Sequence, residues 1–165
     1  MTASSEPGLR EGEIAIDLPA SVDAGLYFIG TIRTPFLRRE DCPRNGAESD
    51  ALCTIEVFER YADALLGIEA CAHLDVLYWL HLSARNIMVL AAAPRPDLRG
   101  VFALRSPVRP NPIGLSVCPL VAVEGRRLTV RGLDCLDGTP LIDLKPHQMG
   151  NGRPAGPGPV PEPAP

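Results

Sequence analysis

IGLSVCPLVAVEGRRLTVRGLD, residues 113–134, consists of two apolar runs separated by a short polar turn. Both runs are rich in the branched side chains that strands favour, and Glu124 and Gly125 lie between them. Because apolar runs on both sides of a short glycine turn are typical of paired strands, we expect an antiparallel hairpin with strands over residues 113–124 and 127–134.

Similar short runs occur on both sides of this hairpin. Strand patterns are present over residues 26–33, 53–58, 73–82, 100–105 and 140–145. Helical spacing of apolar residues is found over residues 60–71, where a glycine interrupts the end of the segment. Many short strands with Gly and Pro between them, and one short helix, predict an all-β fold with a single β-barrel domain.

Both ends of the chain lack such patterns. With 165 residues, the sequence is long enough for one ordinary domain. Residues 1–25 are acidic and aperiodic, and residues 150–165 contain six prolines and four glycines. We therefore expect a flexible acidic N-terminal tail over residues 1–25, a barrel domain over residues 26–149 and a Pro/Gly-rich disordered tail over residues 150–165.

The N-terminus and the cysteines indicate a cytoplasmic protein. No stretch approaches the roughly 20 apolar residues that a membrane-spanning helix needs, and the acidic N-terminus lacks the features of a secretory signal. Five cysteines without a C-x-x-C pair suggest neither a disulfide framework nor a zinc site, so we expect reduced, mostly buried thiols and no metal.

The net charge of −4 comes from the two ends of the chain, and the basic residues between them are unevenly spread. Between positions 85 and 109, a single acid, Asp97, accompanies five arginines: Arg85, Arg95, Arg99, Arg105 and Arg109. Two interpretations stay open. These arginines form either a solvated face or a patch that binds phosphate or carboxylate groups, for which arginine is the better bidentate partner.

The loop RSPVRPNP, residues 105–112, joins this basic region to the hairpin. Its three prolines fix φ and restrict the residues before them to extended backbone, so the loop is stiff before any ligand arrives. A stiff loop can hold Arg105, Arg109 and Asn111 in place and spare the ordering cost that a flexible loop has on binding.

Three further features of the sequence have two possible interpretations, a chemical role or a purely structural one. CPRNG, residues 42–46, is a Pro-Arg turn with an Asn-Gly corner. Asp134 and Asp137 lie three apart at another corner, where Asp before Gly is also ordinary turn chemistry. His81 is expected to share a strand face with His73 and Asp75, either as a hydrogen-bonded core histidine or as a catalytic group. The common nucleotide-binding and hydrolase motifs are missing from the sequence.

These motifs together resemble one family. GVFALRSPVRPNPIGLSV and GLDCLDGTPLIDLKP, preceded in the chain by IGTIRTPF, CPR and HLDVLYWLH, are similar to the TsaA-like (TrmO, YaeB-like) family of S-adenosylmethionine-dependent tRNA (adenine-N6)-methyltransferases. The similarity spans residues 26–147 in the family's order and spacing. The resemblance implies a β-barrel that acts as a homodimer, uses S-adenosyl-L-methionine without a metal, and methylates N6 of threonylcarbamoyladenosine at tRNA position 37, next to the anticodon.

The resemblance also implies roles for individual residues. Those expected to contact the cofactor are Pro43, Arg44, Asn45, His81, Leu82, Arg105, Leu115, Asp134, Cys135, Leu136 and Asp137. Asn45 and Leu82 stand where the family commonly has glutamine. Asp137 is the candidate catalytic proton acceptor, although it can equally anchor the cofactor or shape the turn. The candidate substrate-binding residues are Arg95, Arg99, Arg109 and Asn111.

Three functions stay open. Longer members of the family carry a C-terminal domain that is thought to help hold tRNA, whereas this sequence continues into the proline-rich tail. Beside a tRNA methyltransferase, we therefore consider a methyltransferase of the same barrel type that acts on a small molecule. The third alternative is a non-enzymatic S-adenosylmethionine-binding or dimeric interaction module.

Overall fold

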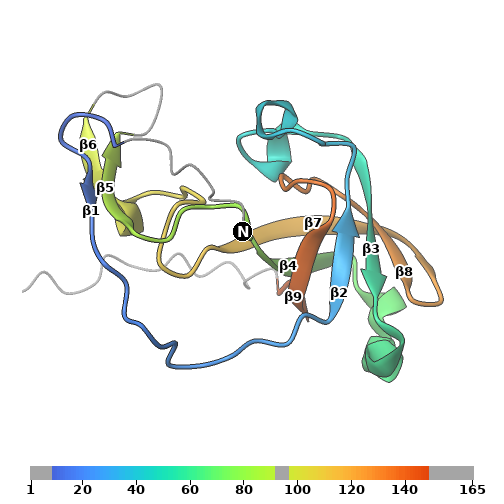
Figure 1. The fold of residues 1–165 in the computed structure, drawn as a ribbon. Helices are drawn as coiled ribbons and strands as arrows, with labels where there is room; N and C mark the ends of the chain where they lie inside the picture. Colours follow the sequence, from blue (N-terminus) through green and yellow to red (C-terminus); the bar gives the residue numbers. More distant parts are fainter. Residues whose placement is uncertain (1–8, 92–96, 149–165) are drawn as a thin grey trace, which may run out of the picture.

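The computed structural model describes residues 9–91 and 97–148 of the chain. In this part, six antiparallel strands form a closed barrel in the order β2-β3-β8-β7-β4-β9 (Figure 1). The barrel strands are β2 (Gly30–Arg33), β3 (Leu52–Val57), β4 (His73–Trp79), β7 (Ile113–Glu124), β8 (Arg127–Arg131) and β9 (Thr139–Pro146). The all-β barrel expected from the sequence is confirmed.

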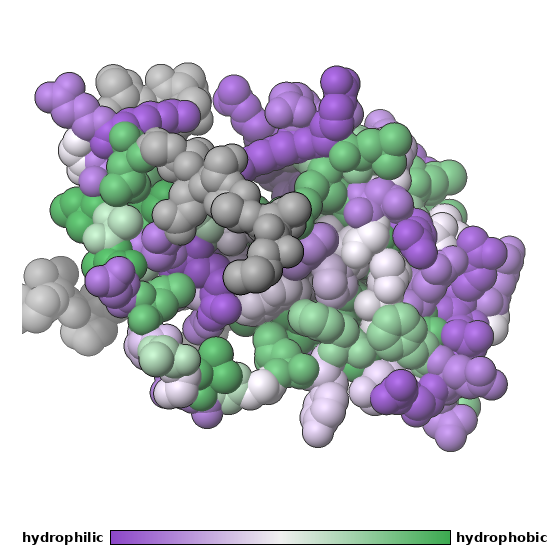
Figure 2. All heavy atoms as spheres, viewed as in Figure 1, coloured by the Kyte–Doolittle hydropathy of each residue, from purple (hydrophilic) through white to green (hydrophobic). Residues whose placement is uncertain are grey.

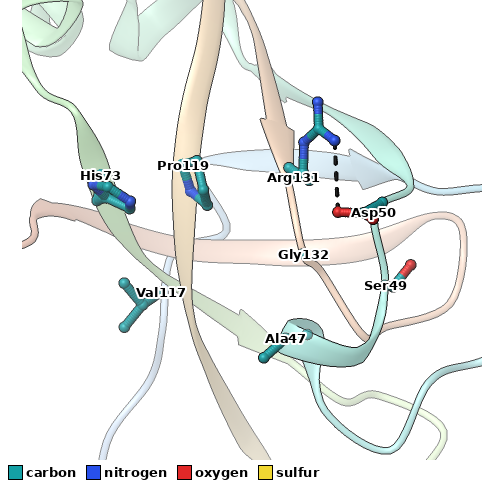
Figure 3. A pocket seen from close by; sticks show the side chains of 9 residues that line it. Ala47, Ser49, Asp50, His73, Val117, Pro119, Arg131 and Gly132 are labelled. Carbon is teal, nitrogen blue, oxygen red and sulfur yellow. Dashed lines mark ion pairs between the residues drawn. The ribbon is translucent and has the colours of Figure 1, made fainter.

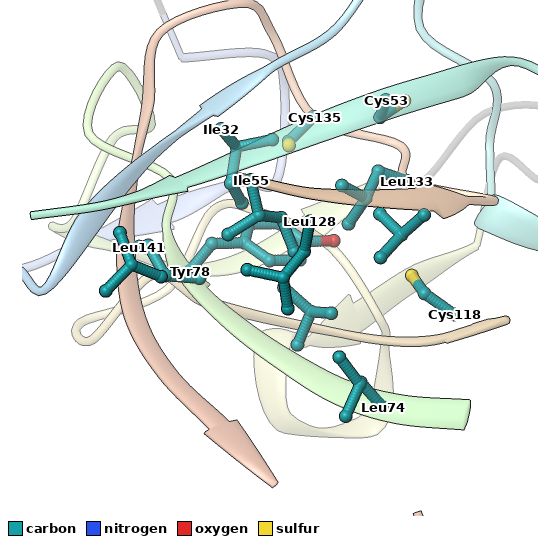
Figure 4. Packing of buried hydrophobic residues seen from close by; sticks show 13 residues of the cluster. Ile32, Cys53, Ile55, Leu74, Tyr78, Cys118, Leu128, Leu133, Cys135 and Leu141 are labelled. Atoms are coloured by element: carbon teal, nitrogen blue, oxygen red, sulfur yellow. The ribbon is translucent and has the colours of Figure 1, made fainter. Parts of the chain in front are cut away.

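Alternating side chains build the core of the barrel. In β3, Cys53, Ile55 and Val57 are buried, whereas Thr54 and Glu56 between them are only half-buried. Successive side chains of a strand point to opposite faces, so each strand gives every second residue to the interior. Fully buried residues in this core are Ile32, Ile55, Leu74, Val76, Cys118, Leu128, Val130, Leu133 and Leu141 (Figure 4). Burial of each large aliphatic side chain stabilises the fold by about 1.5–3 kcal/mol.

The hairpin of β7 and β8 has the turn expected from the sequence. Gly125 has a φ of +58°, which glycine adopts at little cost, and Glu124 pairs with Arg127 across the turn. The pairing with β8 covers only the part of β7 from Leu120 to Glu124, whereas β4 pairs with residues 113–119. Within the described chain, residues 113–119 of β7 therefore have a strand on one side only, and we call the other side the free edge of β7.

A second sheet of three strands lies beside the barrel, at the left of Figure 1. It consists of β1 (Ile14–Ala15), β5 (Ile87–Ala91) and β6 (Leu98–Gly100). The sequence did not predict these strands, because β1 and β6 are too short to show a period. β1 comes from the segment expected as an N-terminal tail and pairs with β5. Apolar side chains, among them Ile14 and Leu98, are exposed on this sheet (Figure 2).

The segment expected as a strand over residues 100–105 has a different structure. It forms a 3-10 helix, η5 (Val101–Ala103). The Arg109 guanidinium donates hydrogen bonds to the carbonyl oxygens of Val101 and Leu104 at 3.3 and 2.6 Å. A side chain therefore satisfies backbone acceptors that would have needed a neighbouring strand, and the turn replaces the expected strand.

The one expected helix, over residues 60–71, is divided in two. It consists of the 3-10 helices η3 (Glu59–Leu65) and η4 (Ile68–Ala70). Gly67 lies between them with a φ of +84°, a conformation that ends a helix. Two more 3-10 helices, η1 (Arg39–Asp41) and η2 (Gly46–Glu48), flank the CPRNG turn.

None of the described helices is long and apolar enough to cross a membrane. The five cysteines are free thiols, and Cys53, Cys118 and Cys135 are buried as expected. The tail expected over residues 150–165 lies outside the described residues.

Candidate functional site

The candidate site is built around the loop between β8 and β9, residues 132–138. This loop is fixed to the chain that leaves β2. The Asp137 amide donates a hydrogen bond to the Phe36 carbonyl at 2.8 Å, and the Gly138 amide donates to the Ile32 carbonyl at 2.9 Å. Two backbone hydrogen bonds between segments more than 100 residues apart hold the loop in a defined place at the end of the barrel.

Asp134 reaches from this loop to two hydroxyl groups that belong to the interior of the barrel. The Tyr78 hydroxyl and the Ser116 hydroxyl, which donates at 3.2 Å, both bind the Oδ1 atom of Asp134. The described residues offer no hydrogen bond to its Oδ2 atom. Every fully buried side-chain oxygen or nitrogen of these residues has a partner, so Oδ2 is in contact with solvent. Asp134 therefore combines a fixed carboxylate with one open oxygen.

The CPRNG turn lies against the same loop. A Cβ atom on Gly46 would lie 1.7 Å from the Gly132 carbonyl oxygen, so only glycine permits this close approach. Burial and then the negative charge of Asp134 raise the pKa of the Cys42 thiol at the start of the turn. The Asn45 side chain accepts a hydrogen bond from the Ala47 amide at 2.9 Å. The structure thus brings the CPRNG turn against the loop that carries Asp134, and the role of residues 43–45 in cofactor binding stays a prediction.

Arg105 approaches the free edge of β7. Its guanidinium donates a hydrogen bond to the Leu115 carbonyl at 3.0 Å. Leu115 precedes Ser116, the residue that binds Asp134. Arg105 and Asp134 are therefore attached to consecutive residues of one strand. The side chain of Arg105 is exposed, and it makes no ion pair within the described part of the chain.

The stiffness of the loop over residues 105–112 comes from more than its prolines. The Leu80 amide donates to the Pro112 carbonyl at 2.8 Å, and the Arg85 guanidinium donates to the Pro110 carbonyl at 2.7 Å. The Arg85 guanidinium also lies over the Trp79 ring, 5.4 Å from its centre. The loop is consequently attached to the end of β4 along its second half.

The candidate substrate-binding residues are spread over different parts of the molecule. The Arg109 guanidinium donates to the carbonyls of Ser106, Val101 and Leu104, so it holds its own loop together. Arg99 lies on β6 and forms an ion pair with Asp97 at 2.6 Å.

Asn111 is exposed, and its carbonyl accepts a hydrogen bond from the Ile113 amide. Arg95 lies outside the described residues. The structure therefore places Arg99 on the second sheet and Arg109 and Asn111 in the loop, and their role in substrate binding stays a prediction.

His81 and Leu82 lie apart from the strand face on which His81 was expected. β4 ends at Trp79, and the His81 amide donates to the Trp79 carbonyl in the turn that follows. Both side chains are exposed. Within the described chain, no side-chain hydrogen bond or ion pair links them to the other expected cofactor residues. The predicted strand face shared by His81 and His73 is therefore wrong, because β4 ends three residues before the end of the apolar run over residues 73–82.

Asp137, the candidate proton acceptor, has both oxygens engaged. Its Oδ1 atom accepts a hydrogen bond from the Thr34 amide at 3.1 Å, and its Oδ2 atom lies 3.6 Å from the Arg33 guanidinium. These contacts fix the carboxylate at the surface of the loop. They suit a residue that shapes the turn, and the role of Asp137 in proton transfer stays a prediction.

A pocket of about 370 Å³ lies beside these residues, on the outside of β7 (Figure 3). Its walls include Gly46, Ala47, His73, Val117, Arg131 and Gly132. None of the residues expected to contact the cofactor or the substrate lines it, but Asn45 and Ser116 are adjacent in the chain to Gly46 and Val117. Arg131 in its wall forms an ion pair with Asp50 at 3.6 Å.

The sequence analysis missed Tyr78 and Ser116. Both belong to apolar strands, β4 and β7, and carry the hydroxyl groups among the buried residues of those two strands. A hydroxyl at a core position of a strand is a signal in itself, because a buried polar atom needs a partner. The sequence alone does not name that partner.

The fold and this edge define the class of protein: a small antiparallel β-barrel that presents a half-buried carboxylate and an exposed guanidinium along one strand. Comparison with known proteins identifies the family. Residues 31–150 match the tRNA-methyltransferase O N-terminal domain, and the chain belongs to this family. The resemblance seen in the sequence is confirmed.

The chain is 53% identical over 140 residues to a probable S-adenosyl-L-methionine-binding protein, VirR, of Rhizobium radiobacter, over 85% of this chain and 80% of that protein. It is 35% identical over 136 residues to the tRNA (adenine(37)-N6)-methyltransferase of Escherichia coli, over 72% of this chain and 55% of that protein. A structure of TrmO from Pseudomonas aeruginosa has a TM-score of 0.65 and 33% identity, over 81% of this chain and 60% of the other. The chain therefore spans little more than half of the length of these two enzymes.

Proposed function

We propose that this protein is an S-adenosyl-L-methionine-dependent methyltransferase that acts on N6 of adenosine 37 in tRNA, in its threonylcarbamoylated form. One observation supports the site above all others. Arg105 and Asp134 bind consecutive residues of β7, and the CPRNG turn packs against Gly132 in the loop that carries Asp134. Three of the segments that the family resemblance assigns to the cofactor thus meet at the free edge of β7.

The side chains at this edge fit the proposed cofactor. S-adenosyl-L-methionine carries a sulfonium, an ammonium and a carboxylate group. The open Oδ2 atom of Asp134 offers a negative charge to a cationic group, and the remaining N–H groups of Arg105 offer hydrogen bonds to a carboxylate. When bound, this cofactor supplies an electrophilic methyl group.

The protein contributes mainly position to such a reaction. Methyl transfer is an in-line displacement whose rate depends on the alignment of the two partners, and the amine nitrogen must lose a proton. Asp137 is the proposed acceptor of that proton, held in place by Thr34 and Arg33. The proposed contacts with the cofactor further include Pro43, Arg44, Asn45, His81, Leu82, Leu115, Cys135 and Leu136.

We further propose that the protein works in the cytoplasm as a homodimer and binds tRNA through Arg95, Arg99, Arg109 and Asn111. A dimer would present the basic loops of two chains to one tRNA molecule. The outer side of β7 supports this proposal, because Ile113, Leu115, Val117 and Val121 are between 40% and 49% exposed there.

A second candidate function is methylation of a small molecule by the same site. The contacts that the arginines make within their own chain favour this alternative. Arg85, Arg99 and Arg109 each bind groups of their own chain, so fewer guanidinium groups are available for phosphates than the sequence suggested.

The nucleoside composition of tRNA tests the proposed function and separates it from this alternative. We expect cells that lack the protein to lose N6-methylated threonylcarbamoyladenosine from their tRNA, as measured by mass spectrometry, and to regain it with the wild-type gene. An unchanged nucleoside profile, together with cofactor binding by the purified protein, would favour the small-molecule methyltransferase.

A further inference from the structure

Tyr78 and Gly114 face each other across β4 and β7, and the glycine makes room for the aromatic ring. The two residues are directly paired in the register of the strands. A Cβ atom on Gly114 would lie 2.1 Å from the Cε2 atom of Tyr78. The Tyr78 side chain is 3% exposed and packs within the core of the barrel (Figure 4). The ring therefore occupies the space that a side chain at position 114 would fill.

This placement brings the Tyr78 hydroxyl next to Ser116 and Asp134 of the candidate site. The hydroxyl lies 2.8 Å from the Ser116 hydroxyl and donates a hydrogen bond to the Oδ1 atom of Asp134. The Ser116 hydroxyl lies 3.2 Å from the same oxygen. Burial, followed by the negative charge of Asp134, raises the pKa of Tyr78 well above its usual range. The phenol consequently keeps its proton and donates a hydrogen bond to Asp134.

We propose that Tyr78 and Ser116 are positioning residues that fix the Asp134 carboxylate so that its open oxygen binds a cationic group of the cofactor. This inference rests on the proposed function. Both hydroxyls bind Oδ1, which leaves Oδ2 as the oxygen that meets solvent. A carboxylate held in one orientation before the ligand arrives loses no further rotational freedom on binding.

The contacts of Tyr78 allow its effect on the orientation of Asp134 to be tested separately from its effect on the packing of the core. Replacement of Tyr78 by Phe keeps the ring that fills the core. The hydrogen bond from Ser116 to Asp134 also remains, so Asp134 does not become an unpaired buried charge. The expected loss is therefore confined to the orientation of the carboxylate.

A double-mutant cycle with calorimetry tests the inference, with S-adenosyl-L-methionine as the ligand and protein stripped of co-purified cofactor. We expect Tyr78→Phe to weaken binding about tenfold, as for one hydrogen bond to a charged group. Asp134→Asn is expected to weaken it further. The variant with both changes should bind within about twofold of Asp134→Asn alone, because Tyr78 acts through Asp134. Tyr61→Phe, which changes another tyrosine that packs against the core, is the control and should bind like the wild type.

Each outcome of this cycle decides the inference. A loss of the same size for Tyr78→Phe in both backgrounds would show a general structural effect, and no loss in the wild-type background would remove the role of the hydroxyl. Either result overturns the inference and leaves the proposed function in place. Wild-type protein that binds no cofactor overturns both, and this failure is recognised because it appears before any substitution is made.

Discussion

Arg105 and Asp134 are held at consecutive positions of one strand, because Arg105 donates to the Leu115 carbonyl at 3.0 Å and Asp134 accepts from the Ser116 hydroxyl at 3.2 Å. These residues are 29 apart in the sequence and carry opposite charges, yet they form no ion pair with each other. Both charges therefore remain available to a ligand. Residues 113–119 of β7 can hold both Arg105 and Asp134 because β8 pairs only with the later part of the strand.

Arg105→Ala is expected to weaken the binding of S-adenosyl-L-methionine by tenfold or more while the protein remains as stable as the wild type. The side chain is exposed, and its described hydrogen bond is to one carbonyl. Calorimetry and thermal unfolding measure the two effects. Arg126→Ala is the matched control, since Arg126 is also an exposed arginine that donates to a single carbonyl, that of Val57. A large drop in stability with unchanged affinity would mean that Arg105 is structural.

Arg109→Ala is expected to destabilise the protein. Its guanidinium donates to three carbonyl oxygens of the segment that contains η5, and hydrogen bonds of charged groups contribute about 1.5–3 kcal/mol each when buried. The side chain is only half-buried, so we expect a total loss of about 1–3 kcal/mol in the free energy of unfolding. Urea unfolding measures it. Unchanged stability together with weaker tRNA binding would assign Arg109 to the substrate alone.

The sequence predicted the barrel well because its strands are regular, but it did not predict the contacts that Arg109 makes within its own chain. The turn at Gly125 and the alternation in β3 follow from local chemistry, so both could be recognised without a structure. Arg109 was expected to face a ligand, but its partners are carbonyls that became available when residues 101–103 formed a turn.

Tyr78 shows a second limit. Its contact with Asp134 depends on the register between β4 and β7, which no local pattern in the sequence reveals. Asp134 itself was found from its motif, whereas the hydroxyls that fix its carboxylate required the fold.

The stability of the protein should fall at alkaline pH. Burial raises the pKa of the Cys118 thiol from 9.0 to about 12. Below pH 9 the thiol is protonated in both the folded and the unfolded protein, and its contribution to the free energy of unfolding is fully present. Between pH 9 and 12 the unfolded chain releases this proton and the folded chain retains it, so the free energy of unfolding falls with rising pH, by at most about 1.4 kcal/mol per pH unit for this group.

Urea unfolding at pH 8 and at pH 10.5 measures this decrease in the free energy of unfolding. The decrease should be smaller for Cys118→Ala, in which the thiol is missing. Equal falls in the two proteins would mean that Cys118 is not the group responsible.

The affinity for tRNA should depend steeply on salt. If the arginines between positions 85 and 109 neutralise phosphates, the logarithm of the affinity falls with the logarithm of the salt concentration with a slope of about −3 or steeper. Arg99→Ala should make the slope shallower by about 1 without changing cofactor binding. Arg60→Ala, on η3 and outside this region, should leave the slope unchanged. A salt-independent interaction would support a small-molecule substrate.

Light scattering tests the proposed homodimer. The chain has a mass of 17.7 kDa, and at micromolar concentration we expect twice this value. Replacement of the exposed Val117 by a charged residue should shift the protein toward the single-chain mass if the outer side of β7 forms the interface. A wild-type mass equal to that of one chain would contradict the dimer.

The most direct measurement of the central claim is methyl transfer in a purified system. The protein is incubated with S-adenosyl-L-methionine that carries a labelled methyl group and with tRNA that contains unmethylated threonylcarbamoyladenosine at position 37, and the nucleosides are then analysed by mass spectrometry. We expect the label at N6 of this nucleoside, and its strong reduction with the Asp134→Asn variant. Unlabelled tRNA, from a protein that binds the cofactor in the same buffer, would contradict the assignment as a tRNA methyltransferase.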